Sequence, residues 1–231
     1  MNYFGFGDPT YFLVIVAFAI TCIASVYMKS TFNKYNQIRS KNGISAYDAA
    51  SKILINNGLT NVRLDRVAGD LTDHYAPLEK VLRLSDTTYN STSIASIGVA
   101  AHEAGHAVQD ATKMTLLTFQ MRIVPVVNIA STLSVPIFLV GLLLNIFGLV
   151  NIGIILFSAT FAYQLITLPI EFDASKRALI TLREYNILDE NELDGVRKVL
   201  RAAALTYVAA AASTILQLLR FMLIAKNNRR N

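Results

Sequence analysis

Two histidines and a glutamate have residue types and a spacing that could carry out chemistry. They lie in His102-Glu103-Ala104-Gly105-His106, an H-E-x-x-H motif within a run of small residues. On a helix, residues four apart face the same side, so His102 and His106 could ligate one Zn²⁺ while Glu103 reaches a metal-activated water. The motif predicts metal-assisted hydrolysis. The alternative is a pair of helix histidines that form hydrogen bonds inside a core.

A catalytic zinc site usually has three protein ligands and one position open to water. The chain has three histidines and a single cysteine, Cys22, which lies inside an apolar run. The third ligand is therefore either His74 or a carboxylate. Glu171 is the strongest carboxylate candidate, and Asp173, on a different face of the same predicted helix, is the next. Glu103 would act as the general base.

Peptide hydrolysis also needs a group that stabilises the oxyanion beside the metal. His74 and its neighbour Tyr75 are the candidates in the sequence. Each has a structural alternative: His74 could be a loop histidine with a structural hydrogen bond, and Tyr75 could serve packing alone. We predict His74 as the second catalytic residue after Glu103.

The composition indicates a membrane protein with one modest polar portion. Hydrophobic residues make up 53% of the 231 residues and charged residues only 16%, whereas soluble domains have about 25% charged residues. The net charge of +5 comes from basic residues that lie mostly beside apolar runs. This distribution is typical of membrane orientation and not of nucleic-acid binding.

Apolar segments predict about four transmembrane helices. The run 123–170 has no charged residue, and a helix of that length would measure about 72 Å, so it must fold back, most simply at 145–151. The first segment could be a signal peptide, but it lacks a basic n-region. The last is either a span or an oblique interfacial helix, because a span would place Lys226 outside. The predicted segments are 11–28, 123–144, 150–169 and 202–225.

The two charged stretches, 29–122 and 170–201, are predicted to face the cytoplasm by the positive-inside rule. The first reads as a small α+β portion, with a helix over 45–57, short strands near 62–67 and 81–84, and a helix to about 120 that carries the motif. The hairpin between the two stretches returns the chain to the side that it left. Glu171 is thus brought back to the side of the histidines.

Four blocks of sequence, 69–77, 84–85, 98–109 and 168–175, carry a family resemblance. Through them the chain resembles the YugP family of bacterial membrane zinc metallopeptidases over nearly its whole length. It is more distantly similar to the HtpX and Ste24 gluzincins, which pair H-E-x-x-H with a downstream glutamate. The resemblance implies zinc on His102, His106 and Glu171, with Glu103 as base.

The chain departs from the family pattern at two positions. Ser175 stands where the distant relatives have an aspartate expected to orient a zinc-ligating histidine. Asp173 is a candidate for that orienting role. Ala76 stands where an aspartate is expected in the close family.

We therefore expect a single membrane metallopeptidase domain over 1–231, with a zincin-like catalytic portion, a Zn²⁺ cofactor and its active site on the cytoplasmic side. Its expected partners are the lipid bilayer and polypeptide substrates that are membrane-associated or misfolded. The alternatives are a catalytically silent membrane scaffold with a structural zinc site and a zinc hydrolase of non-peptide bonds. The presence of Glu103 argues against the scaffold, since a structural site needs no general base.

Overall fold

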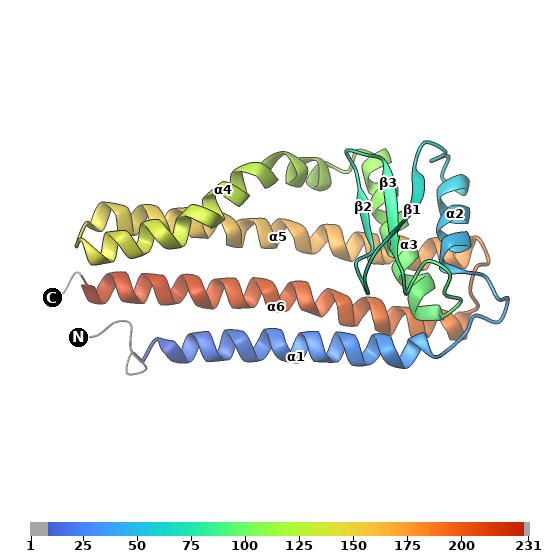
Figure 1. Ribbon diagram of the computed structural model, residues 1–231, viewed down its shortest axis with the longest axis horizontal. Helices are drawn as coiled ribbons and strands as arrows, with labels where there is room; N and C mark the ends of the chain where they lie inside the picture. Colours follow the sequence, from blue (N-terminus) through green and yellow to red (C-terminus); the bar gives the residue numbers. More distant parts are fainter. Residues whose placement is uncertain (1–8, 229–231) are drawn as a thin grey trace. The chain divides into compact units, whose positions relative to one another are not determined.

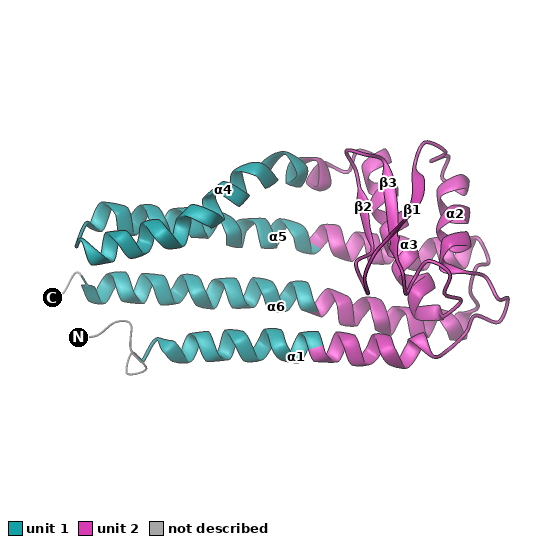
Figure 2. Ribbon diagram, in the orientation of Figure 1, with its two compact units in different colours: residues 1–25, 119–168, 206–231 teal, residues 26–118, 169–205 magenta. Residues whose placement is uncertain are grey.

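The computed structural model describes residues 9–228 and is mainly helical, with six helices and three strands among these residues (Figure 1). It divides into two compact units, each built from separated stretches of the chain (Figure 2). Unit 1 comprises residues 1–25, 119–168 and 206–231, and unit 2 comprises residues 26–118 and 169–205. All the predicted ligands and catalytic residues therefore lie in unit 2.

Four helices in this part of the chain are long and apolar enough to cross a membrane. Their bounds are Tyr11–Asn36 (α1), Thr115–Leu143 (α4), Phe147–Glu184 (α5) and Glu190–Asn228 (α6). In unit 1, large apolar side chains such as Phe18, Val126 and Ile155 are exposed. Such a surface suits hydrocarbon better than water. The expected fold class, a mainly α membrane protein with about four spans, is confirmed.

The hairpin between α4 and α5 depends on two glycines that let the helices approach closely. A Cβ on Gly141 would lie 2.6 Å from the Val150 nitrogen, and one on Gly153 would lie 2.7 Å from the Phe138 Cβ. Phe138 is buried there and stacks on Phe221 of α6, with the ring centroids 4.4 Å apart. Close approach at small residues is the usual means of helix packing in membranes.

The helices extend beyond the predicted spans because polar turns continue them. The hairpin turn covers only residues 144–146, where Asn145 has a φ of +54°, and not 145–151. α5 continues through Pro169, so Glu171 lies within a helix and not at a helix start. α6 covers the predicted last segment, 202–225, and begins well before it, at Glu190.

The motif helix is shorter than expected. It is α3, Ile94–Ala111, and it ends well before residue 120. Lys113 has a φ of +51°, and the Met114 N–H donates to the Gln109 carbonyl, which closes the helix end. α3 begins after Ser93, whose side chain accepts a hydrogen bond from the Ser96 N–H.

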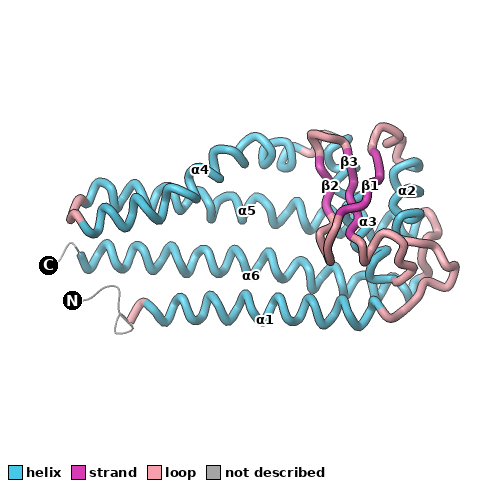
Figure 3. The backbone as a smooth tube through the Cα atoms, in the orientation of Figure 1, coloured by secondary structure: helices cyan, strands magenta, loops and turns pink. Residues whose placement is uncertain are grey.

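Unit 2 combines these helices with a short helix and a three-stranded sheet (Figure 3). β3 (Val81–Ser85) lies in the centre of the sheet. It is parallel to β1 (Arg63–Val67) on one side and antiparallel to β2 (His74–Ala76) on the other. The predicted strands correspond to β1 and β3, whereas the three-residue β2 was not expected. The short helix of unit 2 is α2, Ala46–Asn56.

The core of unit 2 forms around the small residues of α3. Ala100, Ala101 and Ala104 are fully buried, and their size allows neighbouring elements to pack against the helix backbone. The closest approach is at Gly105, where a Cβ would lie 2.8 Å from the Ala174 carbonyl oxygen of α5. This approach places the motif face of α3 against the part of α5 that carries Glu171.

Gly105→Ala should destabilise unit 2, because the added methyl group meets a backbone atom that cannot move aside by a change of rotamer. We expect a loss of about 1–3 kcal/mol, as for other overpacked contacts, seen as a lower unfolding temperature by circular dichroism in detergent. Gly148→Ala is the matched control, since a Cβ at this α5 position meets no atom within 4 Å. Equal unfolding temperatures for the two variants would contradict the assigned packing.

Candidate metal centre

Two histidines of α3 and one glutamate of α5 bring their side chains together in unit 2. Each of His102, His106 and Glu171 offers one ligand atom, and these atoms all lie within 4.8 Å of one another. Glu171 Oε2 lies 3.2 Å from His102 Nε2 and 3.7 Å from His106 Nε2. The two imidazoles are edge to face, with centroids 4.8 Å apart. Both Nε2 atoms thus face the same carboxylate.

This arrangement follows from the spacing of the motif and from the packing at Gly105. His102 and His106 are one turn apart on α3, so both rings emerge from the same face. The three side chains remain 12–15% exposed. The group is therefore largely shielded from bulk solvent but still accessible to a small ion and to water.

The other ring nitrogen of His106 is held by a buried amide. His106 Nδ1 lies 2.9 Å from Gln109 Oε1, and Gln109 is fully buried. The Gln109 Nε2 donates to the Ile170 carbonyl at 2.8 Å and to Asp173 Oδ2 at 2.9 Å. Because both amide hydrogens are used, Oε1 must accept, so His106 Nδ1 carries a hydrogen. In the neutral ring, Nε2 is left with a free lone pair.

His102 has its own partner on α5. Ser175 Oγ lies 3.2 Å from His102 Nδ1, within hydrogen-bond distance. The hydroxyl thus occupies the position where an aspartate was expected, next to the histidine that such an aspartate would orient. Asp173 accepts hydrogen bonds from Gln109 and Arg177. It supports His106 through Gln109.

Glu103 lies beside these groups and is held by the backbone of β2. The Tyr75 N–H donates to Glu103 Oε2 at 3.0 Å. Burial raises the pKa of the Glu103 carboxyl, and the nearby His106 and His102 oppose this rise. A carboxylate whose pKa lies above its ordinary value is better suited to take and return a proton near neutral pH.

Among the described residues, His74 is not part of the group of ligand atoms that could share a metal ion. His74 is the exposed first residue of β2, and its Nδ1 lies 2.8 Å from the Thr72 carbonyl and its Nε2 3.4 Å from an Arg83 guanidinium nitrogen. A catalytic role for His74 stays a prediction. What β2 brings to Glu103 is the backbone N–H of Tyr75.

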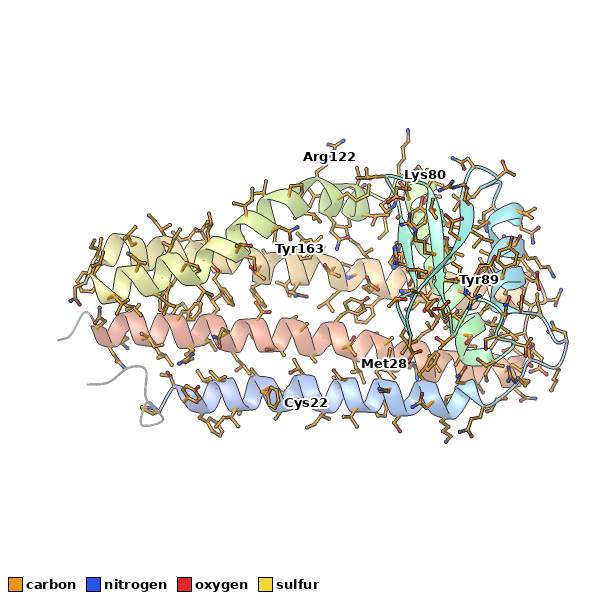
Figure 4. All side chains as sticks on the ribbon, in the orientation of Figure 1. Cys22, Met28, Lys80, Tyr89, Arg122 and Tyr163 are labelled. Carbon is orange, nitrogen blue, oxygen red and sulfur yellow. The ribbon has the colours of Figure 1, made fainter. Side chains whose placement is uncertain are left out.

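The Tyr75 side chain is also engaged. Its hydroxyl donates to Asp110 Oδ2 at 2.7 Å, and Lys80, labelled in Figure 4, pairs with the same carboxylate at 2.5 Å. Burial and the hydrogen bond to Asp110 raise the pKa of the phenol well above its ordinary value, so it remains a donor. Tyr75 of β2 thus forms hydrogen bonds with Glu103 and Asp110, which lie two turns apart on one face of α3.

Sequence reasoning missed Gln109, the contact of Ser175 with His102, and the Tyr75 N–H. The only local signal was the position of Gln109, three residues after His106 on a helix. This spacing places the two side chains on adjoining faces, but it gives no information on the Ile170 carbonyl that completes the amide's hydrogen bonds.

The chemistry of the three side chains fits a divalent cation. Burial lowers the pKa of the His106 imidazole, but the hydrogen bond to Glu171 and the charge of Glu103 outweigh it and raise this pKa to about 9. The side chains thus favour a positive charge between them. Two imidazole nitrogens and one carboxylate oxygen are a ligand set that zinc takes in catalytic sites.

Comparisons with known proteins agree with this chemistry. Residues 10–226 match the family described as "Putative neutral zinc metallopeptidase". The chain is 45% identical over 218 residues to "Putative membrane protease YugP" of Bacillus subtilis (strain 168), an alignment that covers 94% of this chain and 97% of the relative. No solved structure matches the chain. From the match over nearly its whole length, the chain belongs to this zinc metallopeptidase family.

Proposed function

We propose that this chain is a membrane-embedded zinc endopeptidase of the gluzincin type, with His102, His106 and Glu171 as ligands and Glu103 as general base. The observation that carries the proposal is that the ligand atoms of His102 and His106 on α3 and of Glu171 on α5 all lie within 4.8 Å of one another. Glu103 lies on α3 between the two histidines. Membership of a zinc peptidase family supports the choice of metal and of reaction class.

The residues around the site have distinct tasks in this proposal. A zinc ion held by these residues would act as a Lewis acid and would lower the pKa of its water to about 7. Gln109 and Ser175 keep the Nδ1 atoms engaged, so that each histidine presents Nε2. Glu171 faces both Nε2 atoms and contributes the negative charge that offsets the charge of the cation.

Glu103 moves the proton. Its carboxylate accepts a proton as water attacks the peptide carbonyl and then delivers it to the departing amine. The Tyr75 N–H holds Oε2, so the carboxylate is positioned before substrate arrives. The raised pKa of Glu103 favours the second half of this cycle, in which the protonated carboxyl must act as an acid.

We further propose that substrates are membrane-associated or misfolded polypeptides and that the active site faces the cytoplasm. The stretches 29–122 and 170–201, which supply every residue of the site, carry basic residues next to the candidate spans, as the positive-inside rule requires of cytoplasmic segments. The name of the Bacillus relative, a membrane protease, supports a membrane location. The four candidate spans support a multi-pass arrangement, with α6 as the fourth.

Replacing the proposed base tests the mechanism directly. Glu103→Gln keeps the size of the side chain and its contact with Tyr75 but removes the proton acceptor. We expect cleavage of a casein-type or membrane-protein substrate to fall by about 10²–10⁴-fold, with zinc content unchanged when metal is measured on the purified protein in detergent.

Glu184→Gln, at an exposed position of α5, serves as the matched control and should cleave like wild type. If Glu103→Gln retained wild-type cleavage, the general-base assignment would be wrong. Zinc bound without any Glu103-dependent cleavage would favour the structural zinc site, and Glu103-dependent hydrolysis of non-peptide esters alone would favour the third alternative.

Removing the carboxylate ligand tests the metal site separately. Glu171→Ala leaves two histidines, and we expect zinc affinity to drop by at least about 100-fold, since even partners behind the ligands commonly contribute 10–100-fold. Zinc is measured by competition with a chelating dye. His74→Ala and Glu184→Ala should both keep wild-type affinity. Full zinc occupancy in Glu171→Ala would show that another residue is the third ligand.

Gln109 should matter for metal binding although it is not a ligand. Gln109→Ala removes the acceptor at His106 Nδ1 and leaves the Ile170 carbonyl and Asp173 without their donor. We expect zinc affinity about 10–100-fold below wild type. Gln120→Ala, which deletes a partly buried amide bonded to Thr167, controls for the loss of a hydrogen-bonded amide. Equal zinc affinity in the two variants would count against the orienting role.

A further inference from the structure

One arginine in unit 1 is placed where a positive charge is costly. Arg220 belongs to α6, a candidate membrane span, and its Nε is buried with no hydrogen-bond partner. Its guanidinium lies over the ring of Tyr11 on α1, 5.1 Å from the centroid. Ionisable side chains in such helices are rare, and they need a counter-charge or a polar environment.

The described part of unit 1 offers no counter-charge. Residues 9–25, 119–168 and 206–228 contain no aspartate or glutamate, and their charged residues are Arg122, Arg220 and Lys226. A cation–π contact offsets only part of the cost of removing a guanidinium from water. An anion from outside these residues would satisfy Arg220.

A cavity of about 310 Å³ lies along the same helix faces. On α6, Ser213 and Gln217 precede Arg220 by seven and three residues, and on α1, Val14 and Phe18 follow Tyr11 by three and seven residues. Helical spacing thus places the cavity next to the Arg220–Tyr11 contact. Its lining is mixed, with apolar walls from Val14, Phe18 and Phe157 and polar groups from Thr21, Ser213 and Gln217.

We propose that this α1–α6 groove, made by Arg220, Tyr11 and the cavity, binds an anionic phospholipid. The planar guanidinium fork matches a phosphate, which it can bind through two parallel hydrogen bonds. Tyrosine is common at membrane interfaces, where headgroups lie. The apolar walls suit an acyl chain, and Gln217 and Ser213 can donate to the ester oxygens between the two. Arg220 and Lys226 of α6 are positively charged, and the described residues of unit 1 include no carboxylate, so a lipid with net negative charge is favoured.

The test measures lipid binding and not peptide cleavage, so it is independent of the proposed function. Full-length protein is delipidated in detergent and titrated with phosphatidylglycerol or phosphatidylcholine, and bound lipid is counted by native mass spectrometry. Wild type should bind one phosphatidylglycerol in preference to phosphatidylcholine. Arg220→Gln should weaken this binding by about fivefold or more, and Arg220→Lys, which keeps the charge but loses the fork, should fall between.

Two further variants separate the groove from general charge. Arg122→Gln removes the exposed arginine of α4, labelled in Figure 4, and should leave binding unchanged. Val14→Trp fills the cavity while keeping Arg220 and should weaken binding as well. Monodisperse elution and a wild-type circular dichroism spectrum show that each variant is folded.

Several outcomes would overturn the proposal. One is equal lipid binding by Arg220→Gln and Arg122→Gln, and another is equal affinity for the two lipids in wild type. Displacement of the lipid by inorganic phosphate would show that the groove binds a free phosphate group and not a phospholipid. Loss of stability in Asp8→Asn, with unchanged lipid binding in Arg220→Gln, would assign the counter-charge to Asp8, which lies outside the described residues.

Discussion

The close approach of α3 and α5 at Gly105 is the constraint on which unit 2 depends. A glycine at this position allows the Ala174 carbonyl to come within contact distance of the α3 backbone. Glu171, one turn before Ala174, is thereby brought to both histidine Nε2 atoms. The buried alanines of α3 extend the same close packing along the helix. A metal site with ligands on two helices needs such a fixed separation, because an error of one ångström would separate the ligand atoms.

The hydrogen bonds that Gln109 and Ser175 form with the Nδ1 atoms of the two histidines hold the rings in the orientation that metal binding requires. Gln109 is buried with all its hydrogen-bonding groups used, and a buried amide with an unsatisfied group would cost free energy. Its orientation is therefore fixed, and so is the ring of His106. Ser175 acts on His102 in the same way with a neutral hydroxyl. Because neither partner is charged, the negative charge at the site is concentrated on Glu171 and Glu103.

Local patterns in the sequence were sufficient for part of this description. The H-E-x-x-H spacing, the four apolar segments and the helix over 45–57 depend only on neighbouring residues. The limits of the helices were wrong because Pro169 was tolerated within α5 and Lys113 ended α3 through a positive φ. β2 was not predicted because a strand of three residues shows no alternating pattern in the sequence. Its position depends instead on pairing with β3 and on the contact with Glu103 of α3. The residues that orient the histidines depend on tertiary contacts across more than 60 residues of sequence.

In both units a buried polar group needs hydrogen-bond or charge partners, but the partners come from different sources. In unit 2, Gln109 enters a dry core only because the Ile170 carbonyl, Asp173 and His106 satisfy its amide from within the chain. In unit 1, the Nε of Arg220 is buried without a hydrogen-bond partner, and the described residues around the guanidinium provide a ring and no carboxylate. Since the outer surface of unit 1 suits lipid, the solvent itself can supply the missing anion. An unsatisfied polar group inside a protein core costs free energy, whereas a polar group that faces a bilayer can be satisfied by the headgroup of a bound lipid.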